Sequence, residues 1–240
     1  MNILLTNDDG IASLGLKKLE EVLSNYGNVY VVAPSTQQSG KACGISAFFG
    51  VCVNKIDNNH ISVEGTPVDC VEVACAMINN KIDLVVSGCN SGYNLSQDIM
   101  YSGTCGACVQ ASLSKIPSIA FSVKNKDYFH QIDKYAKQVL DFIFTNNLLD
   151  SAYFLNVNIP ESESKGIKLT KVYEPIYESY YPILVDSETN KYIIERKPIN
   201  SIDYEDCDKV AVNNGYISLT VLSQNLFNEE LYKKVKAKLD

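Results

Sequence analysis

Apolar runs of strand length alternate with segments of helical spacing along residues 1–125 of the chain. In the first such segment, apolar residues recur every three or four positions, as they do on one face of a helix. These residues are Leu16, Leu19, Val22 and Leu23. The predicted strands are Ile3–Thr6, Val29–Pro34, Leu84–Ser87 and Ser118–Val123. The alternation is typical of βαβ units and predicts a mostly parallel sheet with helices packed against it.

An inserted hairpin is predicted between the second and third of these strands. Its two strands are Ala47–Asn54 and His60–Glu64, and the polar turn Asp57–Asn59 lies between them. A helix should begin directly afterwards, because Thr66 can act as its N-cap and Asp69 follows three residues later. Helix capping alone is a sufficient explanation for these residue types.

The second half of the chain has a different composition. Tyr135–Phe144 has the pattern of an amphipathic helix, and Tyr153–Pro160 is predicted to rejoin the sheet as a strand. Residues 161–205 are charged and rich in tyrosine, which suits a β-rich arm or a subunit contact. An irregular surface excursion explains the same composition equally well. Gly215–Leu222 is a further predicted strand, and Asn228–Leu239 is a predicted polar helix.

Composition fits one domain of 240 residues with 46% hydrophobic content. No apolar run approaches the roughly 18 residues of a membrane span, and the first residues enter a strand without a basic leader, so we expect a cytoplasmic protein that does not bind membranes. The net charge of -7 argues against general nucleic-acid binding.

We expect the eight cysteines to be reduced and mostly buried. The pair Cys105 and Cys108 lacks the second pair that a zinc site needs, and His60 and His130 are expected to be structural or exposed.

Oxygen-bearing side chains follow three of the predicted strands. Asp8 and Asp9 follow the first, Ser39 follows the second, and Asn90, with Asn94 nearby, follows the third. In a parallel sheet these positions share one edge, where ligands bind. Carboxylate, hydroxyl and carboxamide oxygens suit Mg²⁺, Mn²⁺ or Ca²⁺ and are poor zinc ligands. Each residue alone could be a turn or cap residue, but their shared edge favours a metal site.

A second candidate feature is an anion site at the predicted helix start near residue 103. Ser102, Gly103 and Thr104 are small residues whose backbone N–H groups would face outward, where the helix dipole favours an anion. A simple N-cap by Ser102 or Thr104 is the alternative. A cation site beside an anion site points to phosphate ester chemistry.

Five motifs resemble, in order and spacing, the SurE family of metal-dependent 5′-nucleotidases, also called stationary-phase survival proteins. The five are Ile3–Gly10, Val31–Pro34 with Ser39–Gly40, Gly65–Cys70, Val85–Leu95 and Tyr101–Thr104. The resemblance continues in Asn156–Pro160 and in Asp203 with Gly215–Leu219. Two loops depart from the family pattern: Ser35–Gln38 lacks its usual acidic and basic pair, and Ala12–Gly15 replaces its His-Ala-Pro-Gly. These departures bear on substrate preference.

The resemblance implies an α/β fold with a Rossmann-like, doubly wound and mostly parallel sheet. Residues 1–160 would form the catalytic core, and residues 161–240 would supply an arm, a returning strand and a terminal helix of the same domain. Exchange of the arm with a partner subunit implies a homodimer or homotetramer. The family's metal ligands correspond to residues that are all present here. They are Asp8, Asp9, Ser39 and Asn90.

The expected reaction is hydrolysis of nucleoside monophosphates by water, with one divalent cation, Mg²⁺ or Mn²⁺, as cofactor. Asp8 or Asp9 would share a proton with the water or the leaving group, and the sequence leaves open which one does. The phosphate is expected to be held by four residues. They are Asn94, Ser102, Gly103 and Thr104. An aspartyl-phosphate intermediate is disfavoured, because the two acids are adjacent rather than two residues apart.

Two alternatives belong to other functional classes. The first is a catalytically silent nucleotide- or phosphate-binding protein with the same fold. The second is a magnesium-binding receiver domain, which also begins with a strand that ends in adjacent acids, and Lys124 mimics the receiver lysine. A receiver needs a phosphoacceptor aspartate at the end of its third strand, where this chain has Ser87.

Overall fold

A mostly parallel sheet organises the computed structural model, which describes residues 1–46, 49–173, 177–198 and 205–238. Within these ranges, nine strands form one sheet in the order β3-β4-β2-β1-β5-β6-β7-β11-β8. The strands are β1 (Asn2–Thr6), β2 (Asn28–Pro34), β3 (Cys52–Lys55), β4 (His60–Glu64), β5 (Leu84–Ser91), β6 (Ser118–Val123), β7 (Phe154–Ile159), β8 (Ile167–Thr170) and β11 (Ile217–Leu222). The β3–β4 and β7–β11 pairs are antiparallel and the other neighbours are parallel, which confirms the predicted α/β fold.

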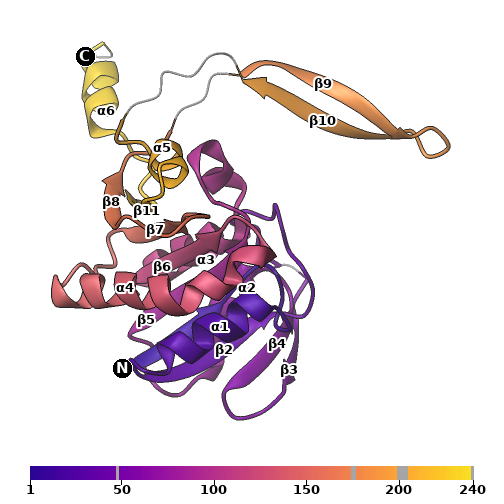
Figure 1. Cartoon of the computed structure of the whole chain (residues 1–240). Helices are drawn as coiled ribbons and strands as arrows, with labels where there is room; N and C mark the ends of the chain where they lie inside the picture. The colour runs from indigo at the N-terminus through magenta and orange to yellow at the C-terminus, as the bar shows by residue number, and fades with distance from the viewer. Residues whose placement is uncertain (47–48, 174–176, 199–204, 239–240) are drawn as a thin grey trace.

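Helices cover both faces of this sheet, as Figure 1 shows. The long helices are α1 (Leu14–Leu23), α2 (Pro67–Met77), α3 (Gly103–Leu113) and α4 (Ile132–Thr145). Because side chains alternate across a strand, Ile3 and Leu5 of β1 pack in one core with α1 and α4. Leu4 points to the other face and packs in a second core with α2 and α3. The sheet is therefore doubly wound, with a buried layer on each side.

The order of the central strands creates a switch point between β1 and β5. The chain leaves β1 toward β2 and β4, then returns through α2 to the opposite side of β1. Ligands of open α/β sheets bind at such a point, outside the carboxyl ends of the strands. The polar residues that follow β1 and β2 lie at this edge, together with Asn90 near the end of β5, which extends to Ser91 instead of ending at the predicted Ser87.

Local signals read from the sequence are confirmed at several element ends. α2 has the predicted capping box, in which Thr66 accepts from the backbone of Asp69 and the Asp69 side chain accepts from the backbone of Thr66. α3 has Ser102 as its N-cap. The terminal helix α6 (Glu229–Lys236) follows the N-cap Asn228, although it ends before the predicted Leu239, which lies outside the described residues.

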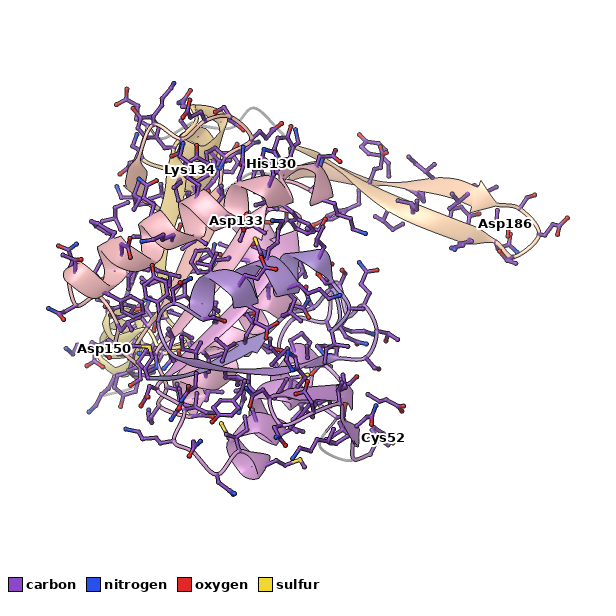
Figure 2. The ribbon with its side chains drawn as sticks, turned by 60° about the horizontal axis from the view of Figure 1, so that its bottom comes forward. Cys52, His130, Asp133, Lys134, Asp150 and Asp186 are labelled. Carbon is purple, nitrogen blue, oxygen red and sulfur yellow. The ribbon has the colours of Figure 1, made fainter. Side chains whose placement is uncertain are left out.

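Some predictions need correction. The first hairpin strand begins at Cys52 rather than Ala47; residues 47 and 48 lie outside the described ranges, and residues 49–51 are not in a strand. Cys43, Cys52 and Cys75 are exposed, while the other five cysteines are buried. Cys52 is exposed because β3 is an edge strand whose residues all face solvent, and Figure 2 shows it at the periphery.

The C-terminal part leaves the sheet and returns to it. A hairpin of β9 (Tyr177–Asp186) and β10 (Lys191–Pro198) extends away from the body, with Asp186 at its tip (Figures 1 and 2). The short helix α5 (Asp208–Asn213) and strand β11 follow. The described part of residues 161–205 thus supplies β8 to the main sheet and then forms the predicted β-rich arm with β9 and β10. Asp203 and Tyr204 lie outside the described residues.

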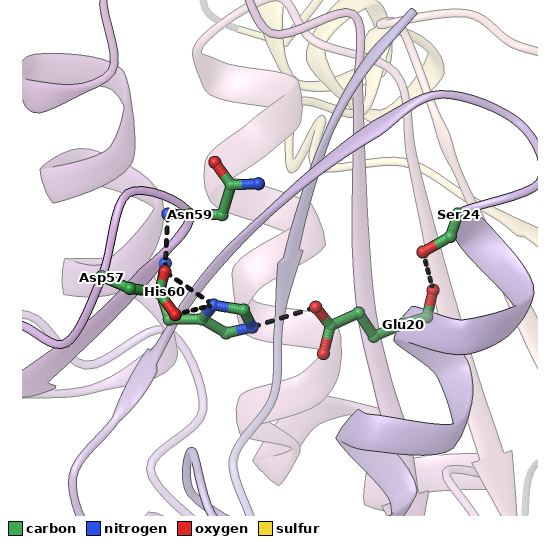
Figure 3. A network of polar contacts seen from close by, with 5 residues as sticks. All are labelled: Glu20, Ser24, Asp57, Asn59 and His60. Carbon is green, nitrogen blue, oxygen red and sulfur yellow. Dashed lines mark hydrogen bonds and ion pairs between the residues drawn. The ribbon is translucent and has the colours of Figure 1, made fainter.

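Both histidines lie at the surface side of the fold. His60, at the start of β4, contacts Asp57 through Nδ1 and Glu20 through Nε2, each at 2.9 Å (Figure 3). This contact joins the hairpin to α1. His130 belongs to the 3₁₀ helix η2 (Lys126–Gln131), and its Nδ1 contacts the carbonyl oxygen of Asp127 at 2.8 Å. Figure 2 shows His130 just before α4.

Candidate active site

The turn that follows β1 is closed by a side chain. Asn7 is fully buried; its Oδ1 accepts from the Gly10 N–H at 3.1 Å and its Nδ2 donates to the Gly10 carbonyl at 3.0 Å. Gly10 has a φ of 99°, which a residue without a side chain adopts most readily. The sequence analysis gave Asn7 no role, although asparagine before a glycine turn is a recognisable signal. The closed turn fixes the backbone from which Asp8 and Asp9 project.

Asp8 is a buried carboxylate held by α3. The residue is only 3% exposed, and the Thr104 hydroxyl donates to its Oδ1 at 2.6 Å. Burial raises the pKa of Asp8 above its ordinary value; the hydrogen bond from Thr104 opposes this rise, and the neighbouring Asp9 charge adds to it. A Cβ at Gly103 would lie 3.0 Å from the Asp8 Cβ. α3 therefore approaches the carboxylate closely because residue 103 has no side chain.

Asp9 joins the β1 turn to the end of β5. The Ser91 N–H donates to Asp9 Oδ2 at 3.1 Å. A register shift between Ser87 and Asn90 interrupts the pairing of β5 with β6 just before this point. The Asn90 amide nitrogen donates to the Gly92 carbonyl at 2.9 Å, which fixes the orientation of its carboxamide. Asp9 and Asn90 therefore come from neighbouring parallel strands at the switch point.

The loop that follows β2 lies against the same turn. The Gln38 N–H donates to the Asp8 carbonyl oxygen at 2.7 Å, and Ser39 follows as an exposed residue. Further along this loop, a Cβ at Gly106 of α3 would lie 2.1 Å from the Ala42 carbonyl oxygen. The loop is thus packed between the β1 turn and α3. The structure brings the loops that carry all four predicted metal ligands to one edge.

The predicted phosphate contacts fall into two groups. Ser102 and Gly103 lie at the start of α3, where Ser102 Oγ accepts from the Cys105 N–H at 3.1 Å. Helix starts leave backbone N–H groups without intrahelical partners, and these can face an anion. The Thr104 hydroxyl donates to Asp8, and the Thr104 backbone N–H also contacts that carboxylate, so both donors of Thr104 face Asp8. Asn94 is 5% exposed and its amide donates to Ser122 Oγ at 2.9 Å.

A pocket of about 300 Å³ adjoins Asp9. Its other walls come from the start of α1, the loop after β2, and η2. They are Ala12, Ser13, Leu14, Gln37, Lys126 and Phe129. The sequence analysis missed Lys126 and Phe129, because no spacing rule links residues after β6 to a turn after β1. Ala12, Ser13 and Leu14 belong to the loop in which the sequence departs from the SurE pattern.

The donor set fits a hard divalent cation. Asp8 Oδ1 accepts from the Thr104 hydroxyl and Asp9 Oδ2 accepts from the Ser91 N–H, and the second oxygen of Asp9 has no partner among the described residues. The amide nitrogen of Asn90 donates a hydrogen bond to the Gly92 carbonyl oxygen. The Asn90 Oδ1 likewise has no partner among the described residues. No cationic side chain pairs with Asp8 or Asp9 in the described part of the chain. A divalent ion would supply the missing positive charge through oxygen ligands.

Comparison with known proteins agrees with this geometry. The family model described as survival protein SurE matches residues 3–179. A protein named 5′-nucleotidase SurE from Clostridium botulinum strain 657 is 38% identical over 248 residues, covering 98% of each chain, and that of strain Alaska E43 is 32% identical over 249 residues, with the same coverage. The crystal structure of SurE from Aquifex aeolicus superposes with a TM-score of 0.88 at 35% identity, covering all of both chains. The chain therefore belongs to the survival protein SurE family.

Proposed function

We propose that this protein is a metal-dependent 5′-nucleotidase that hydrolyses nucleoside monophosphates to nucleoside and phosphate. The observation that carries the proposal is the buried Asp8 carboxylate at the switch point, held by Thr104 and without a cationic partner among the described residues. The names of the Clostridium botulinum relatives support the substrate class. A receiver domain is not favoured, because family membership and fold both point to SurE.

Four side chains would hold one divalent ion, with Mg²⁺ or Mn²⁺ as the favoured metals. They are Asp8, Asp9, Ser39 and Asn90. When bound, the ion would polarise a phosphate oxygen and lower the pKa of a water molecule. Thr104 keeps the Asp8 carboxylate in one orientation, and the Ser91 N–H does the same for Asp9. The protein thereby fixes two ligands before the metal binds.

The start of α3 would bind the phosphate. Gly103 lies beside Asp8, because residue 103 makes a close approach to that side chain, and its backbone N–H at the helix start would face the phosphate. Donors arranged in advance stabilise the charge that develops on the phosphate oxygens in the transition state. The side chains of Asn94 and Ser102 already have hydrogen-bond partners within the protein. Their contact with the phosphate therefore stays a prediction.

We assign the proton-handling role to Asp9 and the leaving nucleoside to the adjoining pocket. Asp9 borders the pocket of about 300 Å³, whereas Asp8 is enclosed. The volume is at the lower end of ligand sites, which suits part of a mononucleotide. Phe129 and Leu14 offer apolar surface to a base or sugar, and Lys126 offers positive charge to a phosphate.

We further propose that residues 1–160 act as the catalytic core and residues 161–240 as the part that forms oligomer contacts. An isolated two-stranded hairpin is marginally stable in water, yet β9 and β10 expose many large apolar side chains. They are Tyr180, Tyr181, Ile183, Leu184, Val185, Tyr192, Ile193 and Ile194. A second copy of the chain would cover them in a homodimer or homotetramer. Light scattering of Ile183→Asp and Ile193→Asp variants should then show a smaller particle than the unaltered protein.

Phosphate release from a panel of nucleoside monophosphates tests the activity. We expect no release in EDTA and restored release when Mg²⁺ or Mn²⁺ is added in excess. Asp8→Asn should keep the fold and lose both metal affinity and rate. Silence of the unaltered protein with every ion and nucleotide would favour a binding role, and normal turnover by Asp8→Asn would refute the metal assignment.

A further inference from the structure

The segment 90–94, which carries the predicted ligand Asn90, is fixed by side chains of another strand. Asn156 and Asn158 of β7 are both fully buried. They are two residues apart in a strand, so both project from the same face of the sheet. Leucine or valine would be the ordinary choice for such positions. Two buried carboxamides in one short strand therefore need partners, and they find them in the backbone of Asn94.

Asn158 pairs with Asn94 as a peptide unit of a neighbouring strand would. Its Oδ1 accepts from the Asn94 N–H at 2.9 Å, and its Nδ2 donates to the Asn94 carbonyl oxygen at 3.1 Å. The Asn156 Nδ2 donates to the same carbonyl at 2.8 Å, so both lone pairs of that oxygen are used. A carboxamide is suited to this contact because it carries a donor and an acceptor in one plane.

Two further contacts fix the same segment from β6. The Asn94 side-chain amide donates to Ser122 Oγ at 2.9 Å, and the Gly92 N–H donates to the Val123 carbonyl at 3.0 Å. Ser122 is fully buried and lies between Asn90 and Asn158 in the strand register. The residues that follow Asn90 are thus held by hydrogen bonds to β6 and β7 at Gly92 and Asn94, and Ser91 contacts Asp9.

We propose that Asn158, together with Asn156 and Ser122, is a positioning residue that holds segment 90–94 in its metal-binding shape. The inference rests on the proposed function, because it assigns these residues to the geometry of the same site. Without Asn158, the Asn94 N–H would lose its acceptor inside the protein, and segment 90–94 would shift to satisfy it. Asn90 would move with the segment, and its side chain would shift away from the Asp8 and Asp9 carboxylates.

The test compares two serines of the same strand. Ser122→Ala removes the acceptor of the Asn94 amide. Ser118→Ala is the matched control, since Ser118 is also buried in β6 and its hydroxyl donates to the Cys108 carbonyl, at 3.1 Å, at the other end of the strand. Asn158→Leu is the stronger variant, because it keeps the number and branching of the side-chain heavy atoms and removes both contacts to Asn94.

Mn²⁺ binding to the metal-free protein, followed by the electron paramagnetic resonance of free Mn²⁺, is the first readout. We expect Asn158→Leu to weaken binding about tenfold or more, as loss of groups that support metal ligands does. Ser122→Ala should weaken Mn²⁺ binding about threefold, as loss of one neutral hydrogen bond does, and Ser118→Ala should stay within twofold of the unaltered protein. Amide exchange should show that the Asn94 N–H is less protected in Asn158→Leu.

The outcomes separate the two proposals. If the unaltered protein neither binds Mn²⁺ nor releases phosphate, the proposed function fails, and the inference fails with it. If the unaltered protein does both, but Asn158→Leu folds and binds Mn²⁺ within twofold, Asn158 is structural and the inference is refuted. If Asn158→Leu does not fold, the comparison of Ser122→Ala with Ser118→Ala tests the inference. Equal Mn²⁺ affinities of these two variants would overturn the inference.

Discussion

Replacing Thr104 with valine would isolate the contact that holds Asp8. Valine keeps the shape of threonine and removes the hydroxyl that donates to Asp8 Oδ1 at 2.6 Å. Both side chains are almost fully buried, so water cannot replace the lost donor without a rearrangement. A hydrogen bond to a charged group contributes about 1.5–3 kcal/mol. We therefore expect Thr104→Val to lower the free energy of unfolding of the metal-free protein by that amount at neutral pH.

Thermal unfolding in EDTA measures the effect. For a chain of this size, about 1 kcal/mol corresponds to roughly 2–4 °C in Tm, so the expected decrease is about 3–12 °C. The same substitution should weaken divalent metal binding, because the Thr104 hydrogen bond lowers the Asp8 pKa and its loss favours the protonated, non-ligating form.

Thr220→Val provides a control for the loss of a buried hydroxyl. Thr220 Oγ1 contacts the neutral Thr170 hydroxyl, at 2.8 Å, and this contact should contribute about 0.5–1.5 kcal/mol. Its loss should leave metal affinity unchanged. If Thr104→Val were no less stable than Thr220→Val and bound metal normally, the hydrogen bond would not be what holds the Asp8 carboxylate.

Three further predictions concern crowding, metal and pH. Gly103→Ala places a Cβ 3.0 Å from that of Asp8 and should reduce kcat/KM at least about tenfold, as misplaced catalytic groups do, in a phosphate-release assay. Mg²⁺ or Mn²⁺ at about 100 times Kd should raise stability by about 2.7 kcal/mol, seen as a Tm increase that Asp8→Asn lacks. Burial lowers the pKa of His60, but hydrogen bonds to Asp57 and the charge of Glu20 outweigh it, so the net pKa is raised. The ion pairs of protonated His60 should contribute about 1 kcal/mol or less to the free energy of unfolding, because they are partly exposed. This contribution is complete below the ordinary histidine pKa and is lost as pH rises through the raised pKa of His60 in the folded protein. Urea unfolding of His60→Gln should show this pH dependence reduced.

Each of these has a contradicting outcome. Unaltered kcat/KM in Gly103→Ala would mean that α3 can move away from Asp8 without cost. An equal metal-induced Tm increase in Asp8→Asn would place the ion elsewhere. An unchanged pH dependence in His60→Gln would show that another group titrates in that range.

Local signals in the sequence were enough to predict much of the fold. The Thr66 and Asp69 pair predicted the start of α2, and the apolar runs predicted β1, β2 and β6 closely, because both depend on neighbours a few residues away. The positions of Asp8, Asp9, Ser39 and Asn90 at one edge followed from the parallel sheet alone. That they bind a metal remains a prediction.

Contacts between distant segments could not be predicted in this way. Thr104 was expected to hold a phosphate, and its hydroxyl was not expected to contact Asp8, which lies 96 positions earlier. The Asn158 contact with Asn94 spans 64 positions. Cys52 was expected to be buried, but its segment lies at the edge of the sheet, and edge position is a property of strand order rather than of composition.

The switch point has a consequence for synthesis on the ribosome. Asp8 and Asp9 are made early, but the backbone that contacts Asp9 comes 82 positions later, and the hydroxyl that holds Asp8 comes later still. At a translation rate of about 5–20 residues per second, Ser91 is synthesised roughly 4–16 s after the two acids. During that interval the nascent chain carries two adjacent carboxylates without the groups that orient them. Tight capture of a divalent ion should therefore coincide with the docking of β5 beside β1.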